Sequence, residues 1–117
     1  MTGNPRILLV EDDVLIGMML ADMFDALDLP EPAQATSNEE ALALIASEPL
    51  GGALVDINLG DEKGWPVADA LAAKDIPFAF TSGGGDVIPP AHAHRKLITK
   101  PFRISDIEAA LEEFGAE

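Results

Sequence analysis

The feature that most limits the possible folds of this chain is a regular alternation of short apolar runs with longer segments of helical periodicity. Unbroken apolar runs lie at residues 7–10, 53–55 and 78–80, and such runs are typical of strands buried on both faces of a parallel sheet. A weaker strand is expected at 32–35 and a last one within 96–99. Strand and helix patterns alternate five times, which predicts an α/β domain with a five-stranded parallel sheet and helices on both faces.

Four of the intervening segments have clear helical patterns, and the fifth does not. Helices are predicted from Asp13, from Ser37 or Asn38, over 66–74 and over about 104–114. In the first of these, the apolar residues at three- and four-residue spacings are expected to face the core: Leu15, Met18, Met19, Met23, Ala26 and Leu27.

The segment between 83 and 94 is expected to hold only a short or irregular element. Pro89 and Pro90 interrupt it, and proline does not allow a regular helix to continue. His92 and His94 lie in this segment and are expected to be exposed rather than metal ligands. Trp65, which follows Gly64, is expected to be a partly exposed packing residue.

Length and composition exclude several classes of protein. A chain of 117 residues fits one domain, expected to span 1–117 with no second module. The net charge of −14 argues against nucleic acid or an anionic membrane as partner. The sequence has no cysteine, which excludes disulfides, thiolate catalysis and cysteine-based metal sites. The start MTGNPR does not resemble a secretory leader, so we expect the protein to be cytoplasmic.

Polar residues stand at the end of each strong strand. Three acids follow the first strand, Asp56 follows the third, Ser82 the fourth and Lys100 the last. The carboxyl ends of parallel strands lie at one edge of the sheet, because right-handed crossovers keep the strands in the same direction. We therefore expect these side chains to converge there.

The converging carboxylates need a positive partner. Asp12, Asp13 and Asp56 would repel one another unless a hard divalent cation lay between them, and ligands that are all oxygen favour Mg²⁺ or Mn²⁺. Each residue alone also has an ordinary interpretation: the acids can be solvated surface, Asp13 can cap its helix and Asp56 can be a turn residue. The coincidence of four strand ends favours a phosphoryl-transfer site.

Several short motifs together resemble one known family. They are VEDD at 10–13, LVDINL at 54–59, Gly64, SG at 82–83 and KPF at 100–102. Over essentially its whole length the chain is similar to CheY-like receiver domains of two-component response regulators, which have a flavodoxin-like fold. The run PFAFTSGGG also resembles the Pro-Phe-x-Phe-Ala-Thr-Gly-Gly motif of single-domain regulators, which are usually partnered with an alphaproteobacterial type of histidine kinase.

The resemblance implies a phosphoacceptor and a set of metal ligands. Asp56 would attack a phosphohistidine on a partner kinase, with Mg²⁺ neutralising charge on the phosphoryl group. Asp13, Asp56 and the backbone carbonyl of Asn58 would hold the metal directly, and Asp12 would hold it through water. The protein would then be a signalling domain rather than an enzyme that turns over a substrate.

The resemblance also implies roles for residues after the last two strands. Lys100 would contact the acyl phosphate, and the bond between Lys100 and Pro101 would be cis. Ser82, rather than Thr81, would be the switch hydroxyl, because it shares a strand face with the preceding phenylalanines. Gly83 would leave room for the phosphoryl group.

The resemblance also points to the partners and to one departure from the family pattern. We expect no fused output domain, so a sensor histidine kinase, a phosphotransfer protein or another regulator would be the partner. The docking face would comprise 83–94, the last strand and the last helix, and the chain would be a monomer or a weak phosphorylation-dependent dimer. Leu97 stands where many receivers have a switch aromatic.

Two other classes of function fit the sequence less well. A Mg²⁺-dependent phosphatase with an aspartate nucleophile usually needs a second aspartate two residues later, where this chain has Asn58. A flavin-binding electron carrier of the same topology is disfavoured by acidic loops and few aromatic residues. The glycines at 83–85 match no nucleotide-binding spacing.

Overall fold

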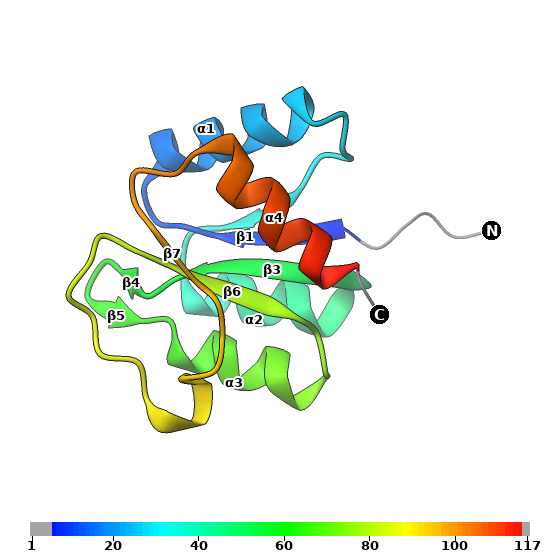
Figure 1. Ribbon diagram of the computed structural model, residues 1–117. Helices are drawn as coiled ribbons and strands as arrows, with labels where there is room; N and C mark the ends of the chain where they lie inside the picture. Colours follow the sequence, from blue (N-terminus) through cyan, green and yellow to red (C-terminus); the bar gives the residue numbers. More distant parts are fainter. Residues whose placement is uncertain (1–5, 116–117) are drawn as a thin grey trace.

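The computed structural model describes residues 6–115 (Figure 1). Residues 1–5, within the start that predicted no leader, lie outside the described part, as do 116 and 117. No helix within 6–115 combines the length and the apolar character that crossing a bilayer requires.

The main sheet has five parallel strands in the order β2-β1-β3-β6-β7, which confirms the predicted flavodoxin-like topology (Figure 1). Its strands are β1 (Arg6–Val10), β2 (Ala33–Ala35), β3 (Leu50–Asp56), β6 (Phe78–Ser82) and β7 (Leu97–Thr99). The helices are α1 (Val14–Ala26), α2 (Asn38–Ser47), α3 (Trp65–Ala73) and α4 (Ile104–Phe114).

Two hydrophobic clusters cover the two faces of this sheet, because successive strand residues point to opposite sides. α1 and α4 cover one face, and α2 and α3 cover the other (Figure 1). The first cluster joins Leu9, Leu54, Ala79 and Ile98 to Leu20 and Phe24 of α1 and to Ile107 and Ala110 of α4. The second joins Leu8, Val10, Ala53, Val55, Phe78 and Phe80 to Ala41, Ile45, Val67, Ala68 and Leu71.

The buried face of α1 differs from the predicted one. Gly17, Leu20 and Phe24 are buried, whereas Leu15 is 76% exposed and Met18 is 58% exposed. The helix is apolar on almost every side, so three- and four-residue spacings fit more than one stripe. The close approach of the helix to β2 selects the stripe through Gly17, where a Cβ would lie 3.0 Å from Gln34 Oε1.

The remaining predicted core positions of α1 are mixed. Met23 is partly buried, as is Leu27 just after α1, whereas Met19 and Ala26 are exposed. The exposed apolar residues leave an apolar strip on the outside of α1.

Two short elements lie between the main ones. β4 (Asn58–Leu59) and β5 (Glu62–Lys63) form a small antiparallel pair between β3 and α3. The 3-10 turn η1 (Pro90–His92) is the regular element between β6 and β7, which confirms that the fourth helix is short or irregular.

The expectation that His92 is exposed was wrong. Its side chain is buried, and its Nε2 lies 2.8 Å from Asp69 Oδ1 on α3. The ring packs edge-on against Phe78 and Phe80, with centroids 5.9 Å apart in both cases. The histidine ring therefore adds to the cover that α3 provides over these two phenylalanines of β6. His94 is exposed, as predicted.

We expect His92→Ala to lower the free energy of unfolding by about 2 kcal/mol, because it removes a buried ring and a hydrogen bond to Asp69. His94→Ala is the matched control and should change stability by less than about 0.5 kcal/mol. Urea denaturation followed by circular dichroism measures both. Equal effects of the two substitutions would contradict the anchoring role of His92.

Candidate functional site

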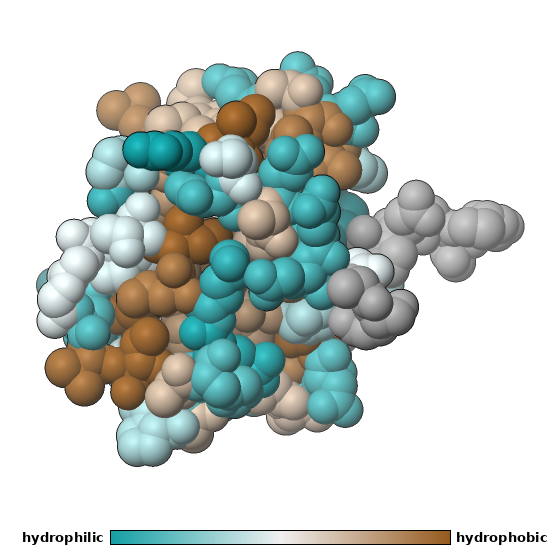
Figure 2. Space-filling view, viewed as in Figure 1, coloured by the Kyte–Doolittle hydropathy of each residue, from teal (hydrophilic) through white to brown (hydrophobic). Residues whose placement is uncertain are grey.

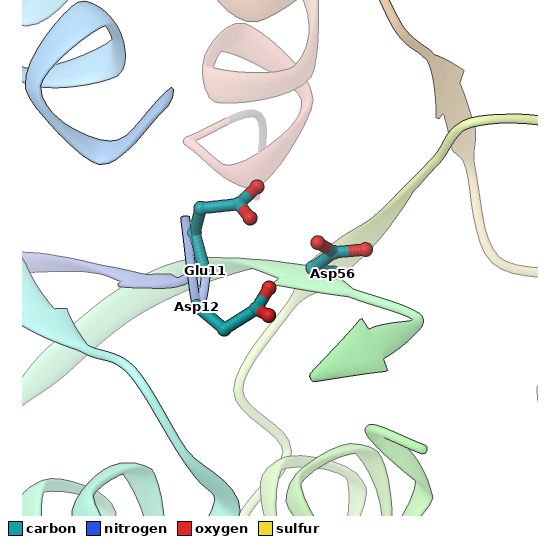
Figure 3. A group of neighbouring side chains, drawn as sticks. All are labelled: Glu11, Asp12 and Asp56. Atoms are coloured by element: carbon teal, nitrogen blue, oxygen red, sulfur yellow. The ribbon is translucent and has the colours of Figure 1, made fainter. Parts of the chain in front are cut away.

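Three carboxylates converge at the carboxyl edge of the sheet. Glu11 and Asp12 follow β1 and Asp56 ends β3, and one oxygen of each lies within 4.8 Å of the others (Figure 3). The register brings them together, because Val10 pairs with Val55 and the next residues therefore lie side by side. Glu11 and Asp56 are 5% and 3% exposed, whereas Asp12 lies at the surface.

Lys100 supplies the positive charge for this group. Its Nζ donates a hydrogen bond to Asp56 Oδ2 at 2.9 Å and forms an ion pair with Glu11 Oε1 at 3.1 Å. The backbone N–H of Lys100 donates to the carbonyl of Ser82 at 2.7 Å, which ties the end of β7 to the end of β6. The bond between Lys100 and Pro101 is cis, the conformation expected from the sequence. The ammonium therefore offsets part of the repulsion among the carboxylates.

Asp56 is held by the backbone around it. Its Oδ1 accepts a hydrogen bond from the N–H of Asn58 at 3.1 Å. Gly64 lies against the main chain of Asp56, since a Cβ at this position would be 2.7 Å from the Asp56 carbonyl oxygen. A side chain at 64 would therefore displace the end of β3.

Asp13 lies outside the carboxylate group that contains Asp56. Its Oδ1 accepts hydrogen bonds from the N–H groups of Leu15 and Ile16, at 2.9 and 3.3 Å, and caps α1. Asp12 instead accepts from the Gly60 N–H at 3.0 Å. The acid that joins Asp12 and Asp56 is Glu11, so the converging set is shifted by one residue from the one the sequence predicted.

The predicted switch residues lie in a second polar network. Ser82 is buried, and its hydroxyl donates to Asp86 Oδ2 and accepts from the Gly84 N–H at 2.9 Å. The Asn58 side chain also donates to Asp86, at 3.1 Å. Gly83 is exposed, and a Cβ placed there would meet no atom within 4 Å. Sequence reasoning did not select Asp86, because it lies in the irregular segment and not at a strand end.

The carboxylate group fits a hard divalent cation. Its ligands are all oxygen, which is the chemistry that Mg²⁺ and Mn²⁺ prefer. Two of the three carboxylates, Glu11 and Asp56, are already paired with the Lys100 ammonium, and Asp12 lies at the open side of the group. The arrangement can therefore hold a divalent cation.

Solved structures with the same fold include close relatives in sequence. No protein-family model and no curated protein sequence matches the chain. The solution structure of SdrG from Sphingomonas melonis Fr1 is 39% identical, with a TM-score of 0.82 over 97% of this chain and 98% of that one. The BeF3-activated conformation of SdrG from Pseudomonas melonis Fr1 is 40% identical, with a TM-score of 0.77 over 95% and 98%.

A third structure is explicitly a regulator domain. The PhyR response regulator REC domain of Erythrobacter litoralis is 30% identical, with a TM-score of 0.77 over 97% of this chain and 92% of that one. The chain belongs to the response regulator receiver domains. In this receiver domain, Leu97 at the usual aromatic position is 43% exposed, at the outer edge of the sheet.

Burial and charge shift the pKa values at the site of this receiver domain. The pKa of Glu11 is raised to about 7, chiefly by burial and also by the charge of Asp56, against the lowering effect of the hydrogen bond from the Asp13 N–H. Burial would lower the pKa of Lys100, but its contacts with Asp56 and Glu11 outweigh burial, so its pKa is raised. Glu11 can therefore exchange a proton near neutral pH.

We expect the Glu11 carboxyl to titrate near pH 7 in magnesium-free buffer, as measured by carbon-13 NMR. Because the folded state keeps this proton while the unfolded state loses it from about pH 4.5, the contribution of Glu11 to stability falls as pH rises from about 4.5 to about 7. The difference in unfolding free energy between the wild type and Glu11→Gln should follow the same curve. A titration midpoint near 4.5 would contradict the burial effect.

Proposed function

We propose that Asp56 accepts a phosphoryl group from a phosphohistidine of a sensor histidine kinase or phosphotransfer protein, in a Mg²⁺-dependent reaction in the cytoplasm. The observation that carries the proposal is the setting of Asp56. It is a buried carboxylate at a strand end that accepts hydrogen bonds from Lys100 and from the Asn58 N–H. Two further acids, Glu11 and Asp12, lie beside it. Membership in the receiver family supports the same assignment.

The proposed reaction is a direct transfer between two side chains. A carboxylate oxygen of Asp56 attacks phosphorus, the phosphorus–nitrogen bond breaks, and its electron pair remains on the imidazole of the partner. The Asn58 N–H orients the carboxylate, and Lys100 balances the negative charge that the acyl phosphate brings into the site. The Ser82 hydroxyl, on the neighbouring strand end, would donate to a phosphoryl oxygen.

We assign the metal to Asp12, Asp56 and the backbone carbonyl of Asn58, with Glu11 as the outer acid. This assignment moves the two acids one residue back along the chain from the sequence-based expectation, because the Asp13 carboxylate caps α1. Bound Mg²⁺ or Mn²⁺ would neutralise charge on the phosphoryl oxygens.

The phosphorylated domain would act through protein partners or drain phosphoryl groups from the kinase. An exposed apolar strip on α1, which begins directly after the site, contains Val14, Leu15 and Met18 at 65%, 76% and 58% exposure. Such a strip supports docking of an apolar partner surface beside Asp56. The segment 83–94, β7 and α4 form the second surface that we propose for partners.

No feature of the site favours a phosphatase. Asn58, two residues after Asp56, carries an amide that cannot transfer a proton as a general acid. We therefore propose a phosphoacceptor rather than an enzyme that turns over a phosphorylated substrate.

Asp12→Asn should weaken Mg²⁺ binding at least about tenfold, because it removes one carboxylate from the group around Asp56. Asp13→Asn is the matched control and should bind Mg²⁺ like the wild type, since the asparagine side chain can still cap α1. Isothermal titration calorimetry with MgCl₂ measures both. If Asp13→Asn loses affinity and Asp12→Asn does not, Asp13 is the ligand after all.

Asp56→Asn should abolish incorporation of phosphate from a small phosphodonor in Mg²⁺, because the amide cannot form the acyl phosphate. Intact mass spectrometry measures the incorporation, and Thr81→Val on the neighbouring strand serves as a hydroxyl-removal control that should still be phosphorylated. Full phosphorylation of Asp56→Asn would remove Asp56 from its proposed role.

A further inference from the structure

We propose that Asp86 is a positioning residue that acts through Ser82. Its carboxylate accepts the hydrogen bond from the Ser82 hydroxyl that the phosphoryl group on Asp56 would need. Phosphorylation and the contact between Ser82 and Asp86 therefore exclude each other. The inference rests on the proposed function and deepens it. Asp86, in the segment after β6, would compete with the phosphoryl group on Asp56 for the Ser82 hydroxyl.

Asp86 gathers donors from three separate parts of the site. Its Oδ2 accepts from the Ser82 hydroxyl at the end of β6, and both its oxygens accept from Asn58 Nδ2, at 3.1 and 3.2 Å. Lys63 Nζ lies 3.5 Å from Oδ1 and also donates to the Asn58 side-chain oxygen. The Asp86 side chain is 13% exposed, so these contacts replace most of its hydration.

The two anions compete for the same hydrogen atom. A serine hydroxyl has one hydrogen to donate, and Ser82 donates it to Asp86. The Gly84 N–H donates to the same hydroxyl oxygen at 2.9 Å, which fixes the hydroxyl in this orientation. A phosphoryl oxygen can accept from Ser82 only after Asp86 has left, and the two negative charges also repel each other.

The chain around Asp86 is built to let it leave. Three exposed glycines separate it from Ser82, and a Cβ at any of them would meet no atom within 4 Å. Gly84 and Gly85 have φ of +110° and +79°, values that glycine adopts without strain. Rotation about these glycines would break no packing of their own.

The movement is limited on its other side. Val87 is 87% exposed, whereas Ile88 packs against the core and His92 is buried beside α3. In Figure 2 the hydrophobic surface at the lower left lies over this part of the segment joining β6 to β7. Release of Asp86 would therefore move residues 83–87 and carry the exposed Val87 side chain with them.

The decisive experiment measures beryllofluoride binding, as a phosphoryl analogue, in MgCl₂ by the fluorescence of Trp65. Asp86→Ala should bind beryllofluoride about tenfold more tightly than the wild type, which corresponds to about 1.4 kcal/mol. Asp86→Asn should show a smaller gain, because the amide oxygen still accepts from Ser82 but carries no charge. Asp61→Ala, in the exposed turn between β4 and β5, removes a charge without this contact and should bind like the wild type.

A second background separates positioning from a general charge effect. In Ser82→Ala, the gain from Asp86→Ala should shrink to less than about twofold, because the donor being contested is gone. A full gain in that background, or none in the wild-type background, overturns the inference while the proposed function stands. If neither the wild type nor Asp86→Ala binds beryllofluoride, the proposed function fails and the inference fails with it. Thermal unfolding of each variant confirms that it is folded.

Discussion

The contact between the Lys100 ammonium and two buried carboxylates is the interaction on which the rest of the site depends. Glu11 and Asp56 lie almost out of reach of water, and like charges so placed are costly unless a cation joins them. Lys100 reaches both from the end of β7, although two strands, β3 and β6, lie between β7 and β1. The lysine thus joins three strands electrostatically, in the same place where the sheet ends and its backbone hydrogen bonds run out.

The sheet topology explains why this place is at one edge. All five strands run parallel, so each contributes its last residues to the same rim, and the pairing of Val10 with Val55 sets Glu11 beside Asp56. The helices then cover both faces and leave the rim accessible. Fold and site are therefore two results of one arrangement, since the hydrophobic strands that fill the core also deliver the polar residues that follow them.

The sequence predicted what depends on strand ends and failed where spacing alone had to decide. Asp56, Ser82 and Lys100 each follow an apolar run, and that signal is unambiguous. Three adjacent acids follow β1, and the apolar run does not show which two of them face Asp56. The sequence-based set named Asp12 and Asp13, whereas Glu11 and Asp12 converge with Asp56 and Asp13 caps α1. Capping preference was the available signal, because an aspartate directly before an apolar helix is a frequent N-cap. Asp86 and the burial of His92 depend on tertiary contacts with β6 and α3, which no local pattern records.

The imidazole ring of His92, which contacts two phenylalanines and an aspartate, divides the connection between β6 and β7 into two parts. In the part before the ring, glycines allow the backbone to change conformation. The part after the ring leads to β7 of the sheet. A long helix in this place would have to move as one unit to change the surface. Here the surface can change over residues 83–87 while the rest of the connection stays in place. A partner could therefore bind the fixed part and distinguish the two arrangements of the part beside it.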